Sequence, residues 1–200
     1  MLRSLVFMSK MLGRLFVISG PSGVGKGTVI SQLLCQISDL TLSVSATTRS
    51  PRDGEVDGTH YHFLTADAFD QMVKENGFSE WCWVHSHRYG TPRYEIEPRI
   101  QAGQHVLVEI DVQGAAKLRQ NYPNLLSIFI APPSEEVLID RLSKRQTESK
   151  DVIDRRILQA KYELSQQHLY SHIVVNDVLE VCVRDVQKLI SDFIKQGESE

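Results

Sequence analysis

The 200-residue sequence predicts a single α/β domain built around a parallel sheet. Short apolar runs typical of buried strands recur along the chain. They alternate with segments whose apolar residues repeat at helical spacing. The first apolar run, residues 15–18, leads into a glycine-rich stretch and then into a helical pattern. This order of strand, glycine-rich turn and helix is how a phosphate-binding loop is built, so the chain is expected to bind a phosphorylated ligand.

The glycine-rich stretch has the pattern G-x-x-x-x-G-K. Its glycines let backbone N–H groups approach phosphate oxygens, and Lys26 adds a charge for the terminal phosphates. The common pattern next has a Ser or Thr that holds magnesium, but this chain has Gly27, and the first hydroxyl follows at Thr28. A glycine-rich turn that binds nothing is the alternative, and Lys26 in register after a strand argues against it. The expected binding residues of the loop are Gly20, Pro21, Ser22, Gly23, Val24, Gly25, Lys26, Gly27 and Thr28.

Composition narrows the classes of function. A hydrophobic content of 42% is enough for one sizeable core, and a net charge of −3 argues against a nucleic-acid partner. The three cysteines are widely spaced, which indicates neither a disulfide framework nor a zinc site and is typical of a reducing cytoplasm. The apolar run at the N-terminus is too short for a signal or a membrane span. Residues 1–12 are therefore expected to be an extension, with Met11 an alternative start.

After the phosphate loop, helical spacing predicts a helix over residues 26–37, and a strand follows over residues 40–45. Residues 46–55 have turn composition and fit no core element. Arg49 and Arg52 lie here, at a strand end where open α/β sheets bind ligands, and their guanidinium groups suit phosphate or carboxylate recognition. Ordinary surface arginines are an equally good interpretation of these two residues alone.

The segment 47–93 has the character of a small, strand-rich insertion. It contains predicted strands over residues 60–64 and 78–85, a helix capped by Thr65, and a turn over residues 87–91. Four histidines at alternate positions raise the alternative of a metal site, although no carboxylate or cysteine joins them as a second type of ligand. These histidines are His60, His62, His85 and His87.

The α/β pattern resumes after the insertion. Helices are predicted over residues 95–102, 114–120 and 134–144, through the segment from Ile153 to Leu164, and over residues 179–193; strands are predicted over residues 105–111, 125–130 and 172–176. The strand at 105–111 ends in Glu109 and Asp111, which places both acids to meet a metal ion or a ligand beside the phosphate loop. The polar stretch 144–151 is typical of a mobile lid or, more simply, of a solvated charged hairpin.

Together these segments closely resemble the guanylate kinase family of P-loop nucleoside monophosphate kinases. The most specific is the pattern S-x-T-T-R-x-P-R-x-G-E, which begins at Ser45. The resemblance covers about residues 13–195. Its other parts are the phosphate loop, Tyr61, Phe63 and residues 78–81, 89–91, 109–114, 130–134 and 175–177.

The resemblance implies a P-loop kinase fold with a five-stranded parallel sheet flanked by helices, a strand-rich GMP-binding insertion and a helical lid. The implied activity is phosphoryl transfer from ATP to GMP, and to dGMP, in purine nucleotide metabolism, with Mg²⁺ accompanying ATP. One domain is implied over residues 13–195, followed by a tail at 196–200. Its core would comprise residues 13–46, 94–144 and 169–195, its GMP-binding region residues 47–93 and its lid residues 145–168.

Site residues carry over position by position. The resemblance implies that the GMP phosphate is held by Arg49, Arg52, Tyr61 and Tyr89, and that guanine is read by Ser45, Glu80, Thr91 and Asp111. It also implies that the transferring phosphoryl group is stabilised by Lys26, Arg145 and Arg156, and that ATP is bound with help from Arg141 and Asn176. Because Gly27 offers no hydroxyl, the candidate magnesium ligands are Thr28, Glu109 and Asp111, directly or through water.

Elementary chemistry supports two of these assignments. Guanine presents N1–H and N2–H₂ donors on one edge, which a carboxylate such as Glu80 can accept, whereas adenine presents a lone pair at N1. Such pairings discriminate by about 10⁴-fold or more. The acceptor in GMP is a phosphate oxygen that is already anionic near neutral pH, so no general base is needed; positioning and cations carry the rate.

Some features depart from the family pattern, and other classes compete. The frequent lid sequence G-R-G-T is here Lys144-Arg145-Gln146-Thr147. A catalytically inactive, peptide-binding module of guanylate kinase type is the main alternative, and the intact phosphate loop argues against it. A P-loop kinase for another acceptor is a third, and a signalling GTPase lacks support because no Asn-Lys-x-Asp motif occurs. The expected partners are ATP and GMP, without nucleic acid or membrane, in a cytoplasmic protein that is a monomer or a homo-oligomer.

Overall fold

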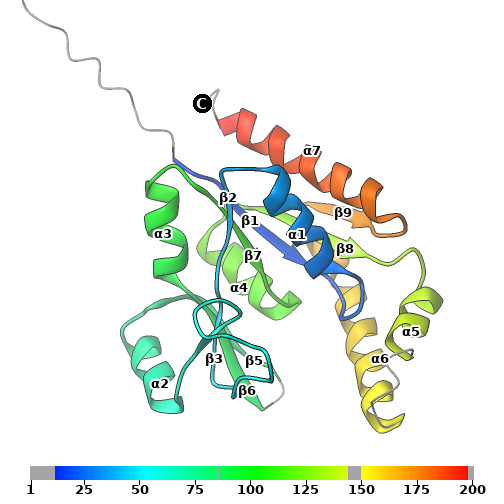
Figure 1. Ribbon diagram of the computed structural model, residues 1–200, viewed down its shortest axis with the longest axis horizontal. Coiled ribbons are helices and arrows are strands. Elements are labelled where there is room, and N and C mark those ends of the chain that lie inside the picture. The colour runs from blue at the N-terminus through cyan, green and yellow to red at the C-terminus, as the bar shows by residue number, and fades with distance from the viewer. Residues whose placement is uncertain (1–11, 85, 144–149, 198–200) are drawn as a thin grey trace, which may run out of the picture.

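The computed structural model describes residues 12–84, 86–143 and 150–197. Its centre is a five-stranded sheet in the order β2-β7-β1-β8-β9, and every pairing in that sheet is parallel (Figure 1). The strands are β1 (Leu15–Ser19), β2 (Leu40–Leu42), β7 (His105–Glu109), β8 (Leu126–Ala131) and β9 (His172–Val175). The predicted five-stranded parallel sheet is therefore confirmed.

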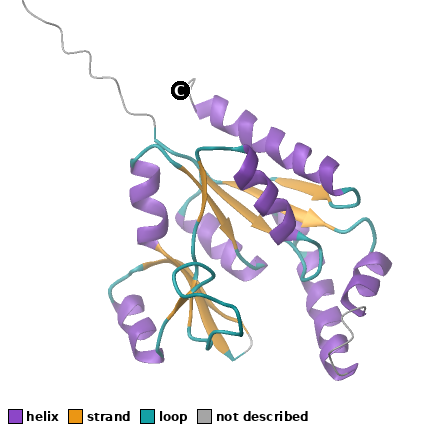
Figure 2. Cartoon of the chain, in the orientation of Figure 1, coloured by secondary structure: helices purple, strands orange, loops and turns teal. Residues whose placement is uncertain are grey.

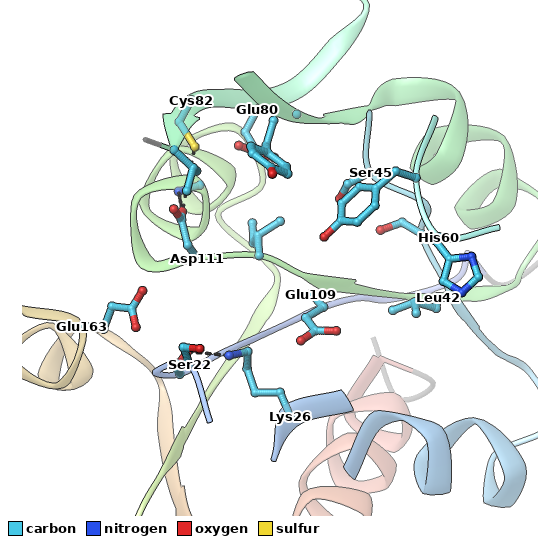
Figure 3. A pocket seen from close by; sticks show the side chains of 18 of the residues that line it. Ser22, Lys26, Leu42, Ser45, His60, Glu80, Cys82, Glu109, Asp111 and Glu163 are labelled. Atoms are coloured by element: carbon cyan, nitrogen blue, oxygen red, sulfur yellow. Dashed lines mark hydrogen bonds between the residues drawn. The ribbon is translucent and has the colours of Figure 1, made fainter. Parts of the chain in front are cut away.

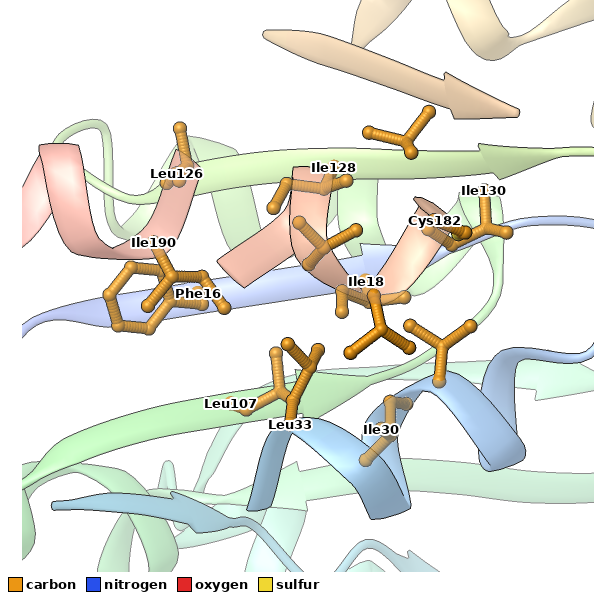
Figure 4. Close-up of a cluster of buried hydrophobic side chains, with 14 of the residues drawn as sticks. Phe16, Ile18, Ile30, Leu33, Leu107, Leu126, Ile128, Ile130, Cys182 and Ile190 are labelled. Atoms are coloured by element: carbon orange, nitrogen blue, oxygen red, sulfur yellow. The ribbon is translucent and has the colours of Figure 1, made fainter. Parts of the chain in front are cut away.

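Helices cover both faces of this sheet. On one face α1 (Lys26–Gln36) and α7 (Leu179–Gly197) pack in a cluster that includes Phe16 and Ile18 (Figure 4). On the other face α3 (Arg93–Gln101) and α4 (Val112–Asn121) pack in a cluster that includes Leu15 and Val17. Alternate residues of β1 thus enter opposite cores, which explains why this strand is apolar throughout rather than at every second position.

A second sheet, in the order β4-β3-β6-β5, stands apart from the first (Figure 2). Its strands are β3 (Ala46–Thr47), β4 (His62–Phe63), β5 (Phe78–Val84) and β6 (His87–Pro92), and α2 (Ala66–Lys74) packs on it through Phe69. The predicted cap of α2 is confirmed, because the Thr65 hydroxyl accepts a hydrogen bond from the backbone N–H of Ala68. This sheet is the strand-rich insertion that the sequence predicts.

Two predictions in this region are wrong. Residues 87–91 form a strand rather than a turn, because Gly90 has no side chain and lets β5 pass closely; a Cβ there would lie 2.8 Å from Phe78 Cδ1. The strand predicted over residues 40–45 ends at Leu42, and the chain then crosses to the second sheet at Ala46. The crossing places the carboxyl end of β2 beside the insertion.

The remaining helices are α5 (Glu135–Ser143), α6 (Lys150–Ser165) and the 3₁₀ turn Gln167–Leu169. Helices α5 and α6 pack together through Leu138, Leu142 and Ala160. The predicted residues Arg145 and His85, the start Met11 and most of the N-terminal extension lie outside the described residues, as do residues 198–200 of the tail. Within the described part of the chain, no helix is both long and apolar enough to cross a membrane.

Candidate nucleotide-binding site

A cavity of about 510 Å³ lies between the carboxyl ends of β1 and β7, the insertion and α6 (Figure 3). Its walls come from three regions: the phosphate loop with the ends of the sheet strands, the insertion, and helix α6. The phosphate loop and the sheet contribute Gly20, Ser22, Lys26, Glu109, Ile110, Asp111 and Gly114; the insertion and the chain leading into it contribute Leu42, Ser43, Ser45, Arg52, His60, Tyr61, Glu80, Cys82, Val84, Tyr89 and Gly90; helix α6 contributes Arg156 and Glu163. Ligands of open α/β folds bind at this edge of the sheet.

The phosphate loop joins β1 to α1 through a tight backbone path. Gly20 has φ 153° and Gly25 has φ 96°, and a Cβ on Gly20 would lie 2.3 Å from the carbonyl oxygen of Ile130. Only glycine suits these positions. Lys26 is the first residue of α1, and its Nζ donates to the carbonyl oxygens of Gly20 at 2.6 Å and Pro21 at 3.2 Å. The ammonium group is thereby held at the open end of the loop.

Three acidic side chains lie near this ammonium group. Burial lowers the pKa of Lys26, while the nearby charges of Glu109, Glu163 and Asp111 raise it. In turn burial raises the pKa values of Glu109 and Glu163, and the charge of Lys26 partly offsets this. Shifted pKa values in a lysine and the acids beside it are typical of a functional site.

Sequence reasoning missed Glu163. It is only 8% exposed, and its Oε1 accepts from Gln159 Nε2 at 3.2 Å, while its Oε2 has no hydrogen-bond partner in the described structure. Figure 3 shows its carboxylate directed toward the cavity from α6. The sequence contains a signal for this residue, because Glu163 lies three residues after Ala160 and therefore on the same face of the helix as the apolar residues. An acidic residue on the apolar face of a helix is a candidate for a functional role.

A second, smaller cavity of about 270 Å³ lies along the other part of the loop. Its lining comprises Gly23, Val24, Gly25, Thr28, Arg141, Asn176, Asp177 and Leu179. Asn176, just after β9, donates from Nδ2 to the carbonyl oxygen of Val24 at 2.7 Å and so braces the loop. The structure therefore brings together Thr28, Arg141 and Asn176, three of the residues predicted to bind ATP.

Glu80 lies at the other end of the main cavity. It is 5% exposed, and the hydroxyl of fully buried Thr91 donates to its Oε1 at 2.7 Å. Burial raises the pKa of Glu80 to about 7, and the charge of Asp111 adds to this, against the hydrogen bond from Thr91. Thr91 is absent from the cavity wall described above, so the structure places it behind Glu80 as a support.

Asp111 closes the same end of the cavity. Its Oδ1 accepts from the backbone N–H of Gly114 at 2.8 Å and caps α4, and Cys82 Sγ lies 3.9 Å from that oxygen. Burial raises the pKa of the Cys82 thiol to about 12, so the thiol stays neutral. Gly114 comes close to Glu80, since a Cβ on Gly114 would lie 2.9 Å from Glu80 Oε2. Helix α4 thus lets the Glu80 carboxylate approach because position 114 lacks a side chain.

For the acceptor site that the sequence resemblance implies, we expect Gly114→Ala to raise the KM for GMP by about tenfold, because the added methyl group would displace the Glu80 carboxylate assigned to guanine. The melting temperature is expected to change little, since the roughly 0.5–1 kcal/mol by which alanine is favoured over glycine within a helix opposes the cost of moving Glu80. Steady-state kinetics and thermal unfolding measure the two quantities. An unchanged KM in a folded variant would contradict the close approach of Gly114 to Glu80.

Four residues of the insertion were predicted to bind a phosphate group, and three of them line the cavity. These are Arg52, Tyr61 and Tyr89. Arg49 is not part of the wall; its Nε donates to the Tyr89 hydroxyl at 3.2 Å, and its guanidinium carbon lies 5.4 Å from the centre of the Tyr61 ring. The structure thus places Arg49 in contact with the two phenol rings that line the cavity.

The remaining predicted residues do not form a single group. Ser45 and Arg156 line the main cavity, and Arg145 lies outside the described residues. The three predicted magnesium ligands are not brought together, because Glu109 and Asp111 line the main cavity whereas Thr28 lines the second. Among the described residues, no group of three or more His, Cys, Asp and Glu side chains is arranged to hold a metal ion.

Two of the four histidines in the alternative metal site contact other residues of the protein. His62 Nε2 pairs with Glu95 Oε1 at 2.9 Å, and His60 Nδ1 accepts from the backbone N–H of Val56 at 3.0 Å. His85 lies outside the described residues. The two described partners explain these histidines as structural residues of the insertion.

The parallel sheet, the phosphate loop and the cavity between loop and insertion define a P-loop kinase. More particularly, the chain belongs to the guanylate kinase family, because the family model described as guanylate kinase matches residues 12–193.

Individual relatives agree with this assignment. The chain is 44% identical to the guanylate kinase of Caldanaerobacter subterraneus subsp. tengcongensis over 181 residues, covering 90% of this chain and 88% of the relative. It is 43% identical to the guanylate kinase of Prochlorococcus marinus strain MIT 9313, covering 89% of this chain and 94% of that one. The crystal structure of guanylate kinase from Anaplasma phagocytophilum is similar with a TM-score of 0.75 and 29% identity, covering 92% and 87% of the two chains.

Proposed function

We propose that this protein transfers the terminal phosphoryl group of ATP to GMP, and to dGMP, giving ADP and GDP or dGDP. The main support for GMP as the acceptor is that the buried carboxylate of Glu80 lines the same cavity as Lys26 and the phosphate loop. A base that offers two adjacent donors can pair with Glu80 while its phosphate reaches toward the loop. The membership of the guanylate kinase family supports this choice.

The donor binds along the phosphate loop in this proposal. Its phosphates would meet the backbone N–H groups of the loop and the N-terminus of α1, and the rest of ATP would enter the second cavity beside Arg141 and Asn176. Lys26 would move from the Gly20 carbonyl to the transferring phosphoryl group. Arg156, from α6, would add charge on the opposite side of the same cavity, with Arg145 nearby in the chain.

The acceptor binds between the insertion and the sheet. Glu80, supported by Thr91, would accept from guanine N1–H and N2–H₂, with Ser45 and Asp111 completing the base site. Arg52, Tyr61 and Tyr89 would hold the phosphate, with Arg49 next to Tyr89. The phosphate oxygen that attacks needs no base, so the residues act by orientation and by excluding water from the reacting groups.

The charge of the main cavity favours a divalent cation with the donor. Four carboxylates line the cavity, Glu80, Glu109, Asp111 and Glu163, against three cations, Lys26, Arg52 and Arg156. Magnesium usually keeps several waters and binds through one or two carboxylates together with substrate phosphates. The residues present fit that mode: Glu109 and Asp111 would hold Mg²⁺ through water, and the ion would neutralise charge on the phosphates.

We assign the parts of the chain accordingly. Residues 13–46, 94–144 and 169–195 would form the core, residues 47–93 the GMP-binding region and residues 145–168 a lid that closes over the reacting phosphates. Cavity-lining Arg156 and Glu163, both on α6, support the last assignment. The setting would be cytoplasmic purine nucleotide metabolism.

The decisive test is ADP production from ATP and Mg²⁺ with GMP, dGMP, AMP, UMP and IMP offered in turn. GMP and dGMP should be used, and AMP and UMP should be used at least about 10⁴-fold less efficiently. IMP, which lacks the N2 amino group, should be intermediate. Equal activity with AMP would refute the guanine assignment, and absence of turnover with all five would favour the inactive, peptide-binding alternative.

A further inference from the structure

The loop between β3 and β4 carries an ion pair to which the proposed reaction assigns no role. The Glu55 carboxylate accepts from both terminal nitrogens of Arg49, with Oε1–Nη2 and Oε2–Nη1 distances of 2.9 Å. Oε2 also accepts from the backbone N–H of Arg52 at 2.7 Å. Only 12% of the Arg49 side chain and 17% of the Glu55 side chain are exposed. One carboxylate therefore contacts both arginines predicted to bind phosphate.

This ion pair fixes which edge of the Arg49 guanidinium group is presented. The group is planar and has five N–H donors. Glu55 takes the end formed by Nη1 and Nη2, the Ser50 carbonyl accepts from Nη1 at 2.7 Å, and the Tyr89 hydroxyl accepts from Nε at 3.2 Å. The second N–H of Nη2 has no acceptor among the described residues. Because the group is planar, that N–H lies on the side edge next to Nε, beside the Tyr89 hydroxyl.

The two phenol rings connect this edge to the cavity. Tyr61 and Tyr89 line the cavity and contact each other edge to face, with ring centres 5.8 Å apart. The guanidinium group of Arg49 contacts both residues, because its carbon lies 5.4 Å from the centre of the Tyr61 ring and its Nε donates to the Tyr89 hydroxyl. A side edge with one remaining donor, next to a phenol hydroxyl, suits a phosphate oxygen.

The carboxylate keeps its charge under ordinary conditions. Hydrogen bonds from Arg49 and from the backbone of Arg52 lower the pKa of Glu55 to about 2. The contact with Glu55 also raises the pKa of Arg49 above its ordinary value. Both groups are therefore ionised throughout the pH range in which a kinase works.

We propose that Glu55 is a positioning residue, which holds Arg49 so that its side edge and the Tyr89 hydroxyl face the phosphate of the acceptor nucleotide. Arg49 without this partner would be free to adopt other rotamers, and the phosphate would have to order it on binding. Glu55 would then govern recognition of the phosphate and not of the base. The inference rests on the proposed function, since it requires that a nucleoside monophosphate binds here.

The test compares GMP with guanosine, which shares the base and lacks the phosphate. Calorimetry measures both affinities for the wild-type chain and for Glu55→Gln, which keeps the shape and removes the charge. We expect GMP affinity to fall by about tenfold, because a charge-assisted hydrogen-bond set is lost, and guanosine affinity to stay the same. Asp70→Asn is the matched control, because Asp70 pairs with Arg88 in the same insertion and neither residue lines the described cavity.

A second variant tests whether Glu55 acts through Arg49. In an Arg49→Ala background, adding Glu55→Gln should change GMP affinity less than about twofold, because residues that act as a unit are not additive. Equal losses for GMP and guanosine, or full additivity, would overturn the inference. So would an unchanged GMP affinity in Glu55→Gln. A wild-type chain that binds GMP no better than guanosine would overturn the proposed phosphate site itself, which separates the two failures.

Discussion

Replacing Lys26 by methionine is expected to lower kcat by at least about 10³-fold, because cations placed on the transferring phosphoryl group contribute roughly 10³–10⁵ in rate. Methionine keeps an unbranched stem of similar length in this half-buried position and removes only the ammonium group. The Gly20 and Pro21 carbonyls that now accept from Nζ then lose their donor. Coupled measurement of ADP release at saturating ATP and GMP gives kcat.

GMP affinity serves as the internal check on the Lys26 prediction. The acceptor site lies at the Glu80 end of the cavity, so the affinity of the variant for GMP should stay within about threefold of the wild-type affinity. A threefold change corresponds to about half of the roughly 1.4 kcal/mol that accompanies a tenfold change in affinity. Lys188→Met is the matched control, because this lysine is 76% exposed on α7 and pairs with Asp192. If GMP binding were lost in Lys26→Met while ATP binding persisted, the donor and acceptor ends of the cavity would have to be exchanged.

Glu80→Gln is expected to lower the preference for GMP over AMP by up to about 10⁴-fold. The amide has nearly the same shape, and its oxygen can still accept from Thr91. Its NH₂ group, however, meets the N–H donors of guanine and favours the acceptor at N1 of adenine. Ratios of kcat/KM for the two nucleotides measure the effect, and Glu75→Gln, an exposed change at the end of α2, is the control. An unchanged ratio would refute the role of Glu80 in reading the base.

The same substitution should abolish a pH dependence. The free protein has a Glu80 pKa of about 7, raised by burial, whereas guanine binds the carboxylate form. Affinity for GMP is therefore full above about pH 8 and falls as the pH decreases below 7, by up to about tenfold per pH unit. Titrations from pH 8 to 6 test this, with Glu80→Gln expected to lack that component. If the affinity for GMP depended on pH in the same way in the wild-type protein and in the variant, Glu80 would be ionised in the free protein over this pH range.

Local patterns in the sequence predicted the core well. Leu15 to Ile18 and the helix after Lys26 carry strong, short-range signals, and so does the Thr65 cap. The strand β6 was missed because glycine, here Gly90, is uncommon in strands and common in turns, whereas in the structure this glycine is required by the neighbouring strand that holds Phe78. Contacts between distant segments decide such cases, and propensity does not report them.

The candidate site divides in the same way. A motif indicates which residues belong together, so the sequence is enough to name Glu80, Arg52, Tyr89 and Lys26, and all four line one cavity. A motif does not distinguish a residue that faces the ligand from one that supports it. Thr91 was assigned to the base, and in the structure its hydroxyl donates to Glu80 instead of lining the cavity; Arg49 was assigned to the phosphate, and it reaches the cavity wall through the Tyr89 hydroxyl.

The sequence by itself determined the class of this protein. The phosphate loop needs its glycines and Lys26 in a fixed local order, and the arginine-rich segment after Ser45 is equally local, so both can be recognised along a single stretch of chain. Only the tertiary structure decided the arrangement around them. The placement of Glu163 beside Lys26, of Gly114 against Glu80 and of Glu55 on Arg49 depends on packing and burial across elements, which no short pattern encodes.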